Sequence, residues 1–347
     1  MHKKVEFRWR GRTWRLLLAV TWCTIVVGQR AYASTSFRLA REGYSSTSKT
    51  LLIVARDDTG DPPKSPWLVM YNAATGSVER LAIPQNSAPC TFAWAPGRTA
   101  FIVTHYEGMT LFQKDASCHG YAPTAIRCPT GFLYTHCSWS PKGEWFAVNC
   151  VDRENITRGR LGLYSLESKK FVRTRLDIDH REVLWRSDGL LHATDNDKVL
   201  AVRLEGGKPV VVRSMPLEGE LTLFYGMFGG QPLFQAFDEI RLGNRTLTAL
   251  DRPVKFRVIA TETTAFIAAS STQLVAFDQE GHEIARINPA KAIVLGSLGE
   301  DPNTVYGLAD SVLLRISVKD RSLKIQEICD LAKKLKEESI SHGSSQK

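Results

Sequence analysis

The chain has 347 residues, 43% of them hydrophobic and 23% charged, and a formal net charge of +9. These proportions are ordinary for a folded soluble protein and exclude a disordered, collagen-like or multi-span membrane chain. Residues 1–33 hold seven basic side chains and one acidic side chain, so the rest of the chain carries a net charge of only +3. A nearly neutral domain lacks the concentrated basic face that nucleic-acid binding needs, so we expect no nucleic-acid partner.

Residues 1–33 have the three parts of a secretory signal peptide. A basic stretch ends at Arg15, a mainly apolar run extends from Leu16 to Val27, and Ala31-Tyr32-Ala33 supplies the small residues that signal peptidase reads. The apolar run is too short to cross a hydrocarbon core about 30 Å thick as a helix. We expect cleavage after Ala33 and a periplasmic or secreted product. An uncleaved signal anchor, which would attach the chain to a membrane through the leader alone, is the alternative.

Internal repetition begins after the leader. Residues 91–104 and 136–149 align without a gap, and 183–194 is a shortened copy. Each segment has an aromatic-bearing strand, a tight turn with Pro, Gly or Asp, and a second apolar strand, which indicates a β-hairpin. Trp94, Trp139 and Trp185 recur at intervals of 45 and 46 residues. That period is typical of propellers and solenoids.

The third hairpin carries a family resemblance. Its run from Trp139 to Ala147, Trp-Ser-Pro-Lys-Gly-Glu-Trp-Phe-Ala, resembles the W-S-P-D-G-x-x-I-A hairpin of TolB-type β-propeller repeats, with Lys142 in place of the usual Asp. The resemblance implies an exported propeller of the TolB or WD-repeat kind that serves as a periplasmic interaction platform. By motif it covers less than half of the chain after the leader.

A second marker extends the pattern over residues 34–328. An apolar strand, a turn and an outer strand recur throughout this range, with equivalent third-strand positions at Tyr71, Phe112, Tyr164, Arg203, Leu242, Phe277 and Ile316. Seven markers predict an all-β, seven-bladed β-propeller of four-stranded blades, which are usual dimensions for this architecture. Two stacked β-domains or an immunoglobulin-like array would use similar strands, but neither a linker nor a composition break divides the range.

One short helix is expected at the C-terminus. Between Gln326 and Glu338 the apolar residues Ile328, Leu331 and Leu335 fall on one side of a helix, while lysines cover much of the rest. We expect this helix to pack on the edge of the ring. The domain organisation is therefore a signal peptide (1–33), a propeller (34–328), and a C-terminal helix with a flexible tail (329–347).

Acidic residues follow the second strand of nearly every predicted blade. Loops after second strands gather on one face of a propeller, together with the loops that link one blade to the next. The predicted ring of carboxylates on this face consists of Asp57, Asp58, Glu107, Asp152, Asp195, Asp238 and Asp310. Such a ring would attract a cation or a basic peptide. Ordinary turn chemistry is the alternative, because Asp favours turns by bonding its own backbone.

The six cysteines after the leader are even in number, which predicts disulfides in an exported chain. They are Cys90, Cys118, Cys128, Cys137, Cys150 and Cys329. Cys137–Cys150 and Cys128–Cys137 are the candidate pairs, and buried free thiols are the alternative. None has the close spacing of a zinc or redox site, so we expect neither a metal nor a cofactor.

No catalytic constellation emerges from the sequence. The histidines are scattered, and the densest polar cluster, Asp177-Ile-Asp179-His180-Arg181, indicates a solvated blade-connecting loop because no nucleophile accompanies it. The favoured function is a non-enzymatic scaffold that binds a protein or peptide through its loop face. The alternative is a lyase or hydrolase acting on a saccharide or small molecule in the central funnel, and the oligomeric state is left open.

Overall fold

The computed structural model describes residues 35–344, apart from 59–65, 82–88, 106–107, 115–119, 180, 218–220, 237–238, 248–256, 261–265, 271 and 302. The chain divides into two units, Met1–Tyr32 and Ala33–Lys347, and the described residues belong to the second. The expected leader and its cleavage site therefore lie outside the described residues. In the part described, no helix is both long and apolar enough to cross a membrane.

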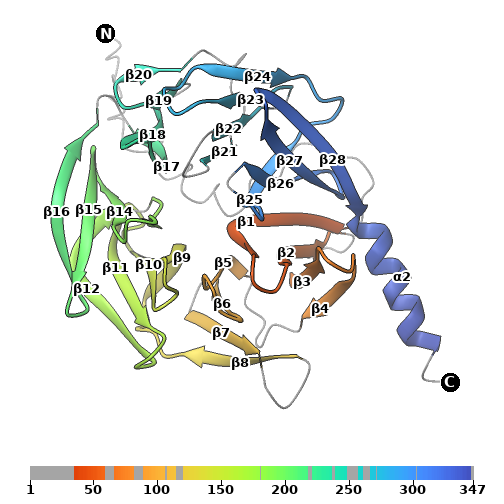
Figure 1. Cartoon of the computed structure of the whole chain (residues 1–347). Coiled ribbons are helices and arrows are strands. Elements are labelled where there is room, and N and C mark those ends of the chain that lie inside the picture. Colours follow the sequence, from red (N-terminus) through yellow and green to blue (C-terminus); the bar gives the residue numbers. More distant parts are fainter. Residues whose placement is uncertain are drawn as a thin grey trace, which may run out of the picture. The chain divides into compact units, whose positions relative to one another are not determined.

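The second unit folds into seven four-stranded antiparallel sheets arranged as the blades of a propeller (Figure 1). Every sheet is built from four consecutive strands, so each blade is a local meander, with its first strand nearest the centre and its fourth at the rim. The predicted all-β, seven-bladed fold is confirmed. Each of the seven third-strand markers read from the sequence lies on the third strand of its blade.

The blades follow one another around the ring in chain order. Blades 1 to 4 comprise β1 (Thr35–Ser45), β2 (Thr50–Asp57), β3 (Trp67–Asn72) and β4 (Val78–Leu81); β5 (Pro89–Trp94), β6 (Ala100–His105), β7 (Gly108–Lys114) and β8 (Tyr121–Ile126); β9 (Phe132–Trp139), β10 (Trp145–Asp152), β11 (Arg158–Ser165) and β12 (Lys170–Asp179); and β13 (Leu184–Trp185), β14 (Leu191–Asp195), β15 (Lys198–Glu205) and β16 (Lys208–Pro216). Blades 5 to 7 comprise β17 (Leu221–Phe228), β18 (Gln231–Ala236), β19 (Glu239–Leu242) and β20 (Arg245–Thr246); β21 (Arg257–Ala260), β22 (Phe266–Ala269), β23 (Leu274–Phe277) and β24 (Glu283–Ile287); and β25 (Val294–Leu298), β26 (Thr304–Ala309), β27 (Val312–Lys319) and β28 (Ser322–Asp330).

The hydrophobic core is divided among the spaces between neighbouring blades. The buried apolar residues form seven clusters, and each cluster joins the facing sheets of two adjacent blades. Trp139, only 2% exposed, shows how a blade is tied to its neighbour, because its indole Nε1–H donates to the carbonyl of Ala93 in blade 2 at 3.0 Å. Trp139 of the third hairpin therefore serves the contact between blades as well as its own sheet.

The ring closes without a shared strand. Blade 7 is completed by its own β28, and the first strands of blades 7 and 1, β25 and β1, lie in contact. At that contact a Cβ added to Gly296 would lie 2.1 Å from Cβ of Leu39, so only glycine lets the two strands approach this closely. The junction between the first and last blades is a close-packed contact of side chains and backbone.

Helix α2 (Leu331–Ser344) secures the same junction from the rim (Figure 1). Leu331 is fully buried in one cluster with Tyr71 and Val78 of blade 1, and Oε1 of Glu338 accepts the Val78 N–H at 3.2 Å. The predicted packing on the ring edge is thus observed, but the helix starts at Leu331 and not at Gln326.

Residues 326–330 belong instead to β28. Their apolar spacing fits a helix and a half-buried strand alike, and the pairing of β28 with β27, which continues to Asp330, decides for the strand. Asp330 then ends the strand and caps the helix, because its Oδ1 accepts the N–H groups of Ala332 and Lys333 at 3.0 and 3.2 Å.

Candidate functional site

The predicted acidic residues that are described lie at the ends of second strands or directly after them. Asp57, Asp58, Asp152, Asp195 and Asp310 have this position in blades 1, 3, 4 and 7, which puts them on one face of the ring. Glu107 and Asp238 lie outside the described residues. The structure therefore gives five of these acids the placement that the sequence predicts.

Most of these five carboxylates have local partners. Asp58 pairs with Arg56 at 2.5 Å, and Asp310 pairs with Lys291 at 3.0 Å. Asp152 and Asp195 bond within their own turns: Asp152 accepts the Glu154 N–H, and Asp195 accepts the side-chain amide of Asn196. Because Asp58 and Asp310 are ion-paired, the combined negative field of the ring is weakened. The loop face as a partner-binding surface stays a prediction.

The innermost strand of blade 1 contains a large bulge. Four residues of this strand, Ala40 to Gly43, stand opposite the single residue Leu52 of β2. β1 is the first strand of its blade and lies near the centre of the ring (Figure 1). The bulge holds the two adjacent charged residues Arg41 and Glu42.

Arg41 and Glu42 form a bridge from blade 1 to two blades that are not its neighbours. The Arg41 guanidinium donates to the Tyr225 carbonyl of β17 in blade 5 at 2.5 Å. Glu42 accepts the Ser138 hydroxyl at 2.5 Å on Oε1 and the Trp139 N–H at 3.1 Å on Oε2, both from β9 in blade 3. Through this bridge the first strand of blade 1 is bonded directly to blades 3 and 5.

Among the carboxyl groups of the described residues, Glu42 has a strongly raised pKa. It keeps a small accessible surface, but the protein surrounds it, and burial raises its pKa to about 7. The hydrogen bonds from Ser138 and Trp139 and the charge of Arg41 act in the opposite direction without cancelling that effect, while nearby Glu182 raises the pKa further. At neutral pH, Glu42 is thus divided between its neutral and charged forms.

A histidine lies close to this bridge. His136 is the bulged residue of β9, with a left-handed backbone (φ 45°), and its Nδ1 lies 3.1 Å from Oε1 of Glu182 on the connector to blade 4. Both side chains remain partly exposed, at 24% and 34%. Arg41, His136 and the carboxylates of Glu42 and Glu182 therefore converge near the axis, and neither Arg41 nor Glu42 was among the residues expected to form a site.

A signal for the bridge was present in the sequence. Arg41, Glu42 and Gly43 interrupt an otherwise alternating strand, and an isolated Gly inside a strand pattern indicates a bulge. What the sequence alone does not show is that this bulge belongs to an innermost strand and reaches blades 3 and 5.

The polar cluster at 177–181 is solvated only in part, in contrast to the loop that the sequence indicated: the Asp177 side chain is 76% exposed, and His180 lies outside the described residues. Asp179 is buried, accepts the Thr194 hydroxyl of blade 4 at 2.5 Å, and pairs with Arg181. Arg181 also donates to the carbonyls of Asn196 and of Leu221 in blade 5. Asp179 and Arg181 thus join blades 3, 4 and 5. The bonds also stabilise the buried carboxylate of Asp179, because a buried charge is stable only when it is paired and hydrogen-bonded.

The described cysteines correct the disulfide expectation. Cys128, Cys137, Cys150 and Cys329 are free thiols, so neither candidate pair is bonded, while the side chains of Cys90 and Cys118 lie outside the description. Cys137 and Cys150 are core residues of the space between blades 2 and 3. Burial raises the pKa of both thiols and brings that of Cys128 to about 12, which favours the unreactive protonated form.

Asp278, Glu280 and His282 form one grouping that could hold a metal ion. Their ligand atoms lie within 4.8 Å of one another in the turn between β23 and β24. The turn itself accounts for the arrangement, because Oδ1 of Asp278 accepts the N–H groups of Glu280 and His282. Glu280 and His282 are exposed, and such acidic turns are common without a metal.

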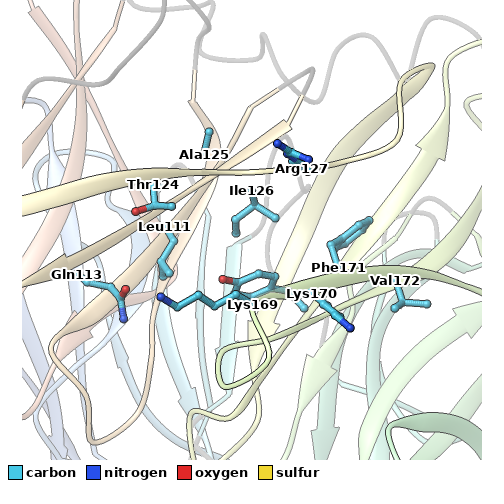
Figure 2. A pocket seen from close by; sticks show the side chains of 11 residues that line it. Leu111, Gln113, Thr124, Ala125, Ile126, Arg127, Lys169, Lys170, Phe171 and Val172 are labelled. Atoms are coloured by element: carbon cyan, nitrogen blue, oxygen red, sulfur yellow. The ribbon is translucent and has the colours of Figure 1, made fainter.

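Away from the axis, a groove opens between blades 2 and 3 (Figure 2). Its volume is 460 Å³, within the usual range for ligand-binding clefts. Figure 2 shows side chains of residues 124–127, at the end of β8, on one side and those of 169–172, at the start of β12, on the other. Leu111 and Gln113 of β7 and Tyr164 of β11 complete the lining.

Comparison with known proteins finds similarity in fold only. No family model matches the chain, and no curated protein matches its sequence. Among solved structures, Kluyveromyces lactis Hsv2 matches with a TM-score of 0.54 at 10% identity, covering 84% of this chain and 98% of that one. An oligogalacturonate lyase in complex with manganese matches with a TM-score of 0.53 at 10% identity, covering 84% and 89%.

A third structure, U3-55K, matches with a TM-score of 0.51 at 10% identity and covers 72% of this chain and 83% of that one. One of these three proteins is a lyase, so the fold by itself does not decide between catalysis and binding. The likenesses establish that this chain is a β-propeller, and the blade count follows from its own seven sheets.

Proposed function

We propose that this propeller is a non-enzymatic scaffold that binds a protein or peptide. The observation that carries the proposal is the bridge from blade 1, where Arg41 bonds to blade 5 and Glu42 bonds to blade 3. A propeller enzyme with a central site needs its reactive groups presented to a substrate there. Here the same space holds side chains that tie the blades together.

The polar groups of the centre are already occupied by contacts within the protein. Ser138 is fully buried, and its Oγ donates to Glu42 while accepting the Trp185 N–H at 3.0 Å. Both carboxyl oxygens of Glu42 accept hydrogen bonds from β9. A nucleophile must reach the substrate, and a general base must reach the proton it removes. Ser138 and Glu42 are instead bonded to each other and to backbone groups of the blades, so they hold the blades together.

We further propose that the scaffold is exported, because residues 1–33 have the basic, apolar and small-residue parts of a signal peptide. N-terminal sequencing of the protein isolated from its native source tests this. The proposal expects a chain that starts at Ser34, whereas a chain that starts at Met1 would replace export with a signal anchor.

The binding role is tested by capturing the tagged protein from its native envelope and measuring the composition and stoichiometry of what it retains. We expect one partner at a fixed ratio to the propeller, and we expect the Glu42→Gln variant to retain the same partner. Recovery of the folded propeller alone under gentle extraction, together with turnover of a supplied substrate, would contradict the proposal.

An enzymatic function is the second candidate, and one observation favours it. A carboxyl group with a pKa near 7 can act as a general acid or base, and His136 with Glu182 lies close to Glu42. A lyase or hydrolase acting on a saccharide or small molecule would then use the centre of the ring. Screening saccharides with wild-type protein and Glu42→Gln separates the two functions, because only the enzyme loses turnover in the variant.

A further inference from the structure

The groove between blades 2 and 3 has an apolar floor. Leu111, Ile126 and Tyr164 line it and are at most 8% exposed, while Phe171 is partly buried against the same core cluster. Val172 at its margin is 56% exposed, the highest value among the large hydrophobic side chains of the described residues. Val172 therefore extends the apolar floor to the exposed margin of the groove.

The floor depends on a specific backbone feature. A Cβ added to Gly162 of β11 would lie 2.7 Å from a ring carbon of Phe171 and 2.6 Å from Sγ of Cys150. Glycine at this position therefore lets the Phe171 ring lie against β11, where it also meets the Tyr134 ring edge-on at a centroid distance of 5.8 Å. Gly162 and Tyr134 thus hold the Phe171 ring in place along the groove.

The rim of the groove is basic. Arg127 lies on one side and Lys169 and Lys170 on the other (Figure 2), and the lining includes no acidic residue. In the described part of the chain, none of these three cations has an ion-pair partner. Three like charges around one apolar cavity repel one another, and an anionic occupant relieves that repulsion.

We propose that this groove binds an acidic peptide segment, which places an apolar side chain on the floor and carboxylates against the rim. The proposal rests on the scaffold function and names the chemistry of its partner. Charge excludes the chain's own N-terminal segment as the occupant, because residues 1–33 are themselves basic. A simple polyanion would contact the rim but would leave the apolar floor exposed, so the floor and the rim together select an amphipathic segment.

The test uses a fluorescent synthetic peptide of twelve residues in which Glu alternates with Leu and Phe, and fluorescence anisotropy measures its Kd. Lys169→Glu with Lys170→Glu reverses one side of the rim. We expect the Kd to increase at least about tenfold, because like charges placed across an interface are strongly unfavourable. Val172→Ser should weaken binding without any change in charge.

The matched control is Arg321→Glu with Lys324→Glu in blade 7. Arg321 directly precedes the outer strand β28 with φ 57°, as Lys169 directly precedes the outer strand β12 with φ 55°. Both control side chains are exposed, so this variant makes the same charge change on an equivalent hairpin away from the groove. Its Kd should stay within about twofold of the wild-type value.

Three further probes decide between occupants: a peptide with Lys in place of Glu, a polyglutamate of equal length, and vesicles containing phosphatidylserine. The proposal expects weak or undetectable binding of all three. Polyglutamate binding equal to that of the amphipathic peptide would overturn it, as would vesicle binding that depends on Lys169 and Lys170 without peptide binding.

Peptide binding tests the groove, whereas capture of a partner tests the scaffold function, so the two can fail separately. If the acidic peptide does not bind but a stoichiometric partner is captured from the envelope, the groove assignment is wrong and the scaffold remains. If the capture also fails, the scaffold function itself is wrong.

Discussion

Glu42 links the protonation of one side chain to the stability of the whole ring. Its folded-state pKa is about 7, whereas an unperturbed glutamate has a pKa near 4.3. The folded protein therefore binds this proton more tightly than the unfolded chain does. The stability contributed by the proton is fully present below about pH 4 and is lost as the pH rises toward 7.

From this shift we expect the free energy of unfolding to fall by roughly 3 kcal/mol between about pH 4 and pH 7 because of Glu42 alone. Glu42→Gln keeps a neutral hydrogen-bonding group and should flatten that part of the profile. Urea unfolding of both proteins across this pH range measures the difference. Parallel profiles for the two proteins would show that the folded-state pKa of Glu42 is that of an ordinary glutamate, which would contradict the shift.

The cysteines provide a second prediction at the residue scale. Burial raises the pKa of the Cys137 and Cys150 thiols, and the thiolate is the reactive form, so neither should react with iodoacetamide in the folded protein. Peptide mass spectrometry after labelling should find both modified only when denaturant is present during the reaction. A Cys137–Cys150 bridge in the unreduced protein would restore the disulfide hypothesis in place of the free thiols.

At the scale of the element, the strands were the most predictable feature, and the bulges and the exact start of the helix were the least. Repeated hairpins with Trp94 and Trp139 fix the period, and an alternating pattern is enough to locate a third strand such as that of Phe112. A bulge such as Ala40–Gly43 depends on contacts with blades far away in sequence. Likewise the sequence could not show that Gly162 makes room for Phe171, because the two lie on different strands.

Trp139 tests the packing of one blade on the next. Trp139→Ala removes a buried ring and the hydrogen bond to Ala93, so we expect a loss of roughly 3–5 kcal/mol in the free energy of unfolding. Chemical denaturation measures it. A loss below about 1 kcal/mol is the size expected at a surface position and would be incompatible with this packing.

Gly296 tests how the ring closes. Any larger residue at this position must push β25 away from Leu39 of β1, so Gly296→Val should destabilise the protein by several times the effect of Gly108→Val. Gly108 of β7 is the control because it has open space around it and does not adopt the left-handed backbone that a Val would strain. Similar melting temperatures for the two variants would mean that the contact between blades 7 and 1 tolerates separation.

The whole molecule carries two candidate binding surfaces of opposite charge. The sequence pointed to the acidic loop face, which recruits a basic partner if its carboxylates act together. The structure adds the basic groove between blades 2 and 3, which fits an acidic segment. The sequence could not reveal the groove because Arg127 and Lys169 come from different blades and meet only once the sheets pack.

Native mass spectrometry of the propeller recovered from its native source decides between a scaffold and an enzyme, because it counts partner molecules per propeller. Wild type, Glu42→Gln and Lys169→Glu with Lys170→Glu should be compared at equal expression. We expect the same partner occupancy for wild type and Glu42→Gln, and a much lower occupancy for the groove variant. A folded wild-type protein that never carries a partner, or one whose activity on a substrate disappears with Glu42→Gln, would contradict a scaffold whose centre is structural.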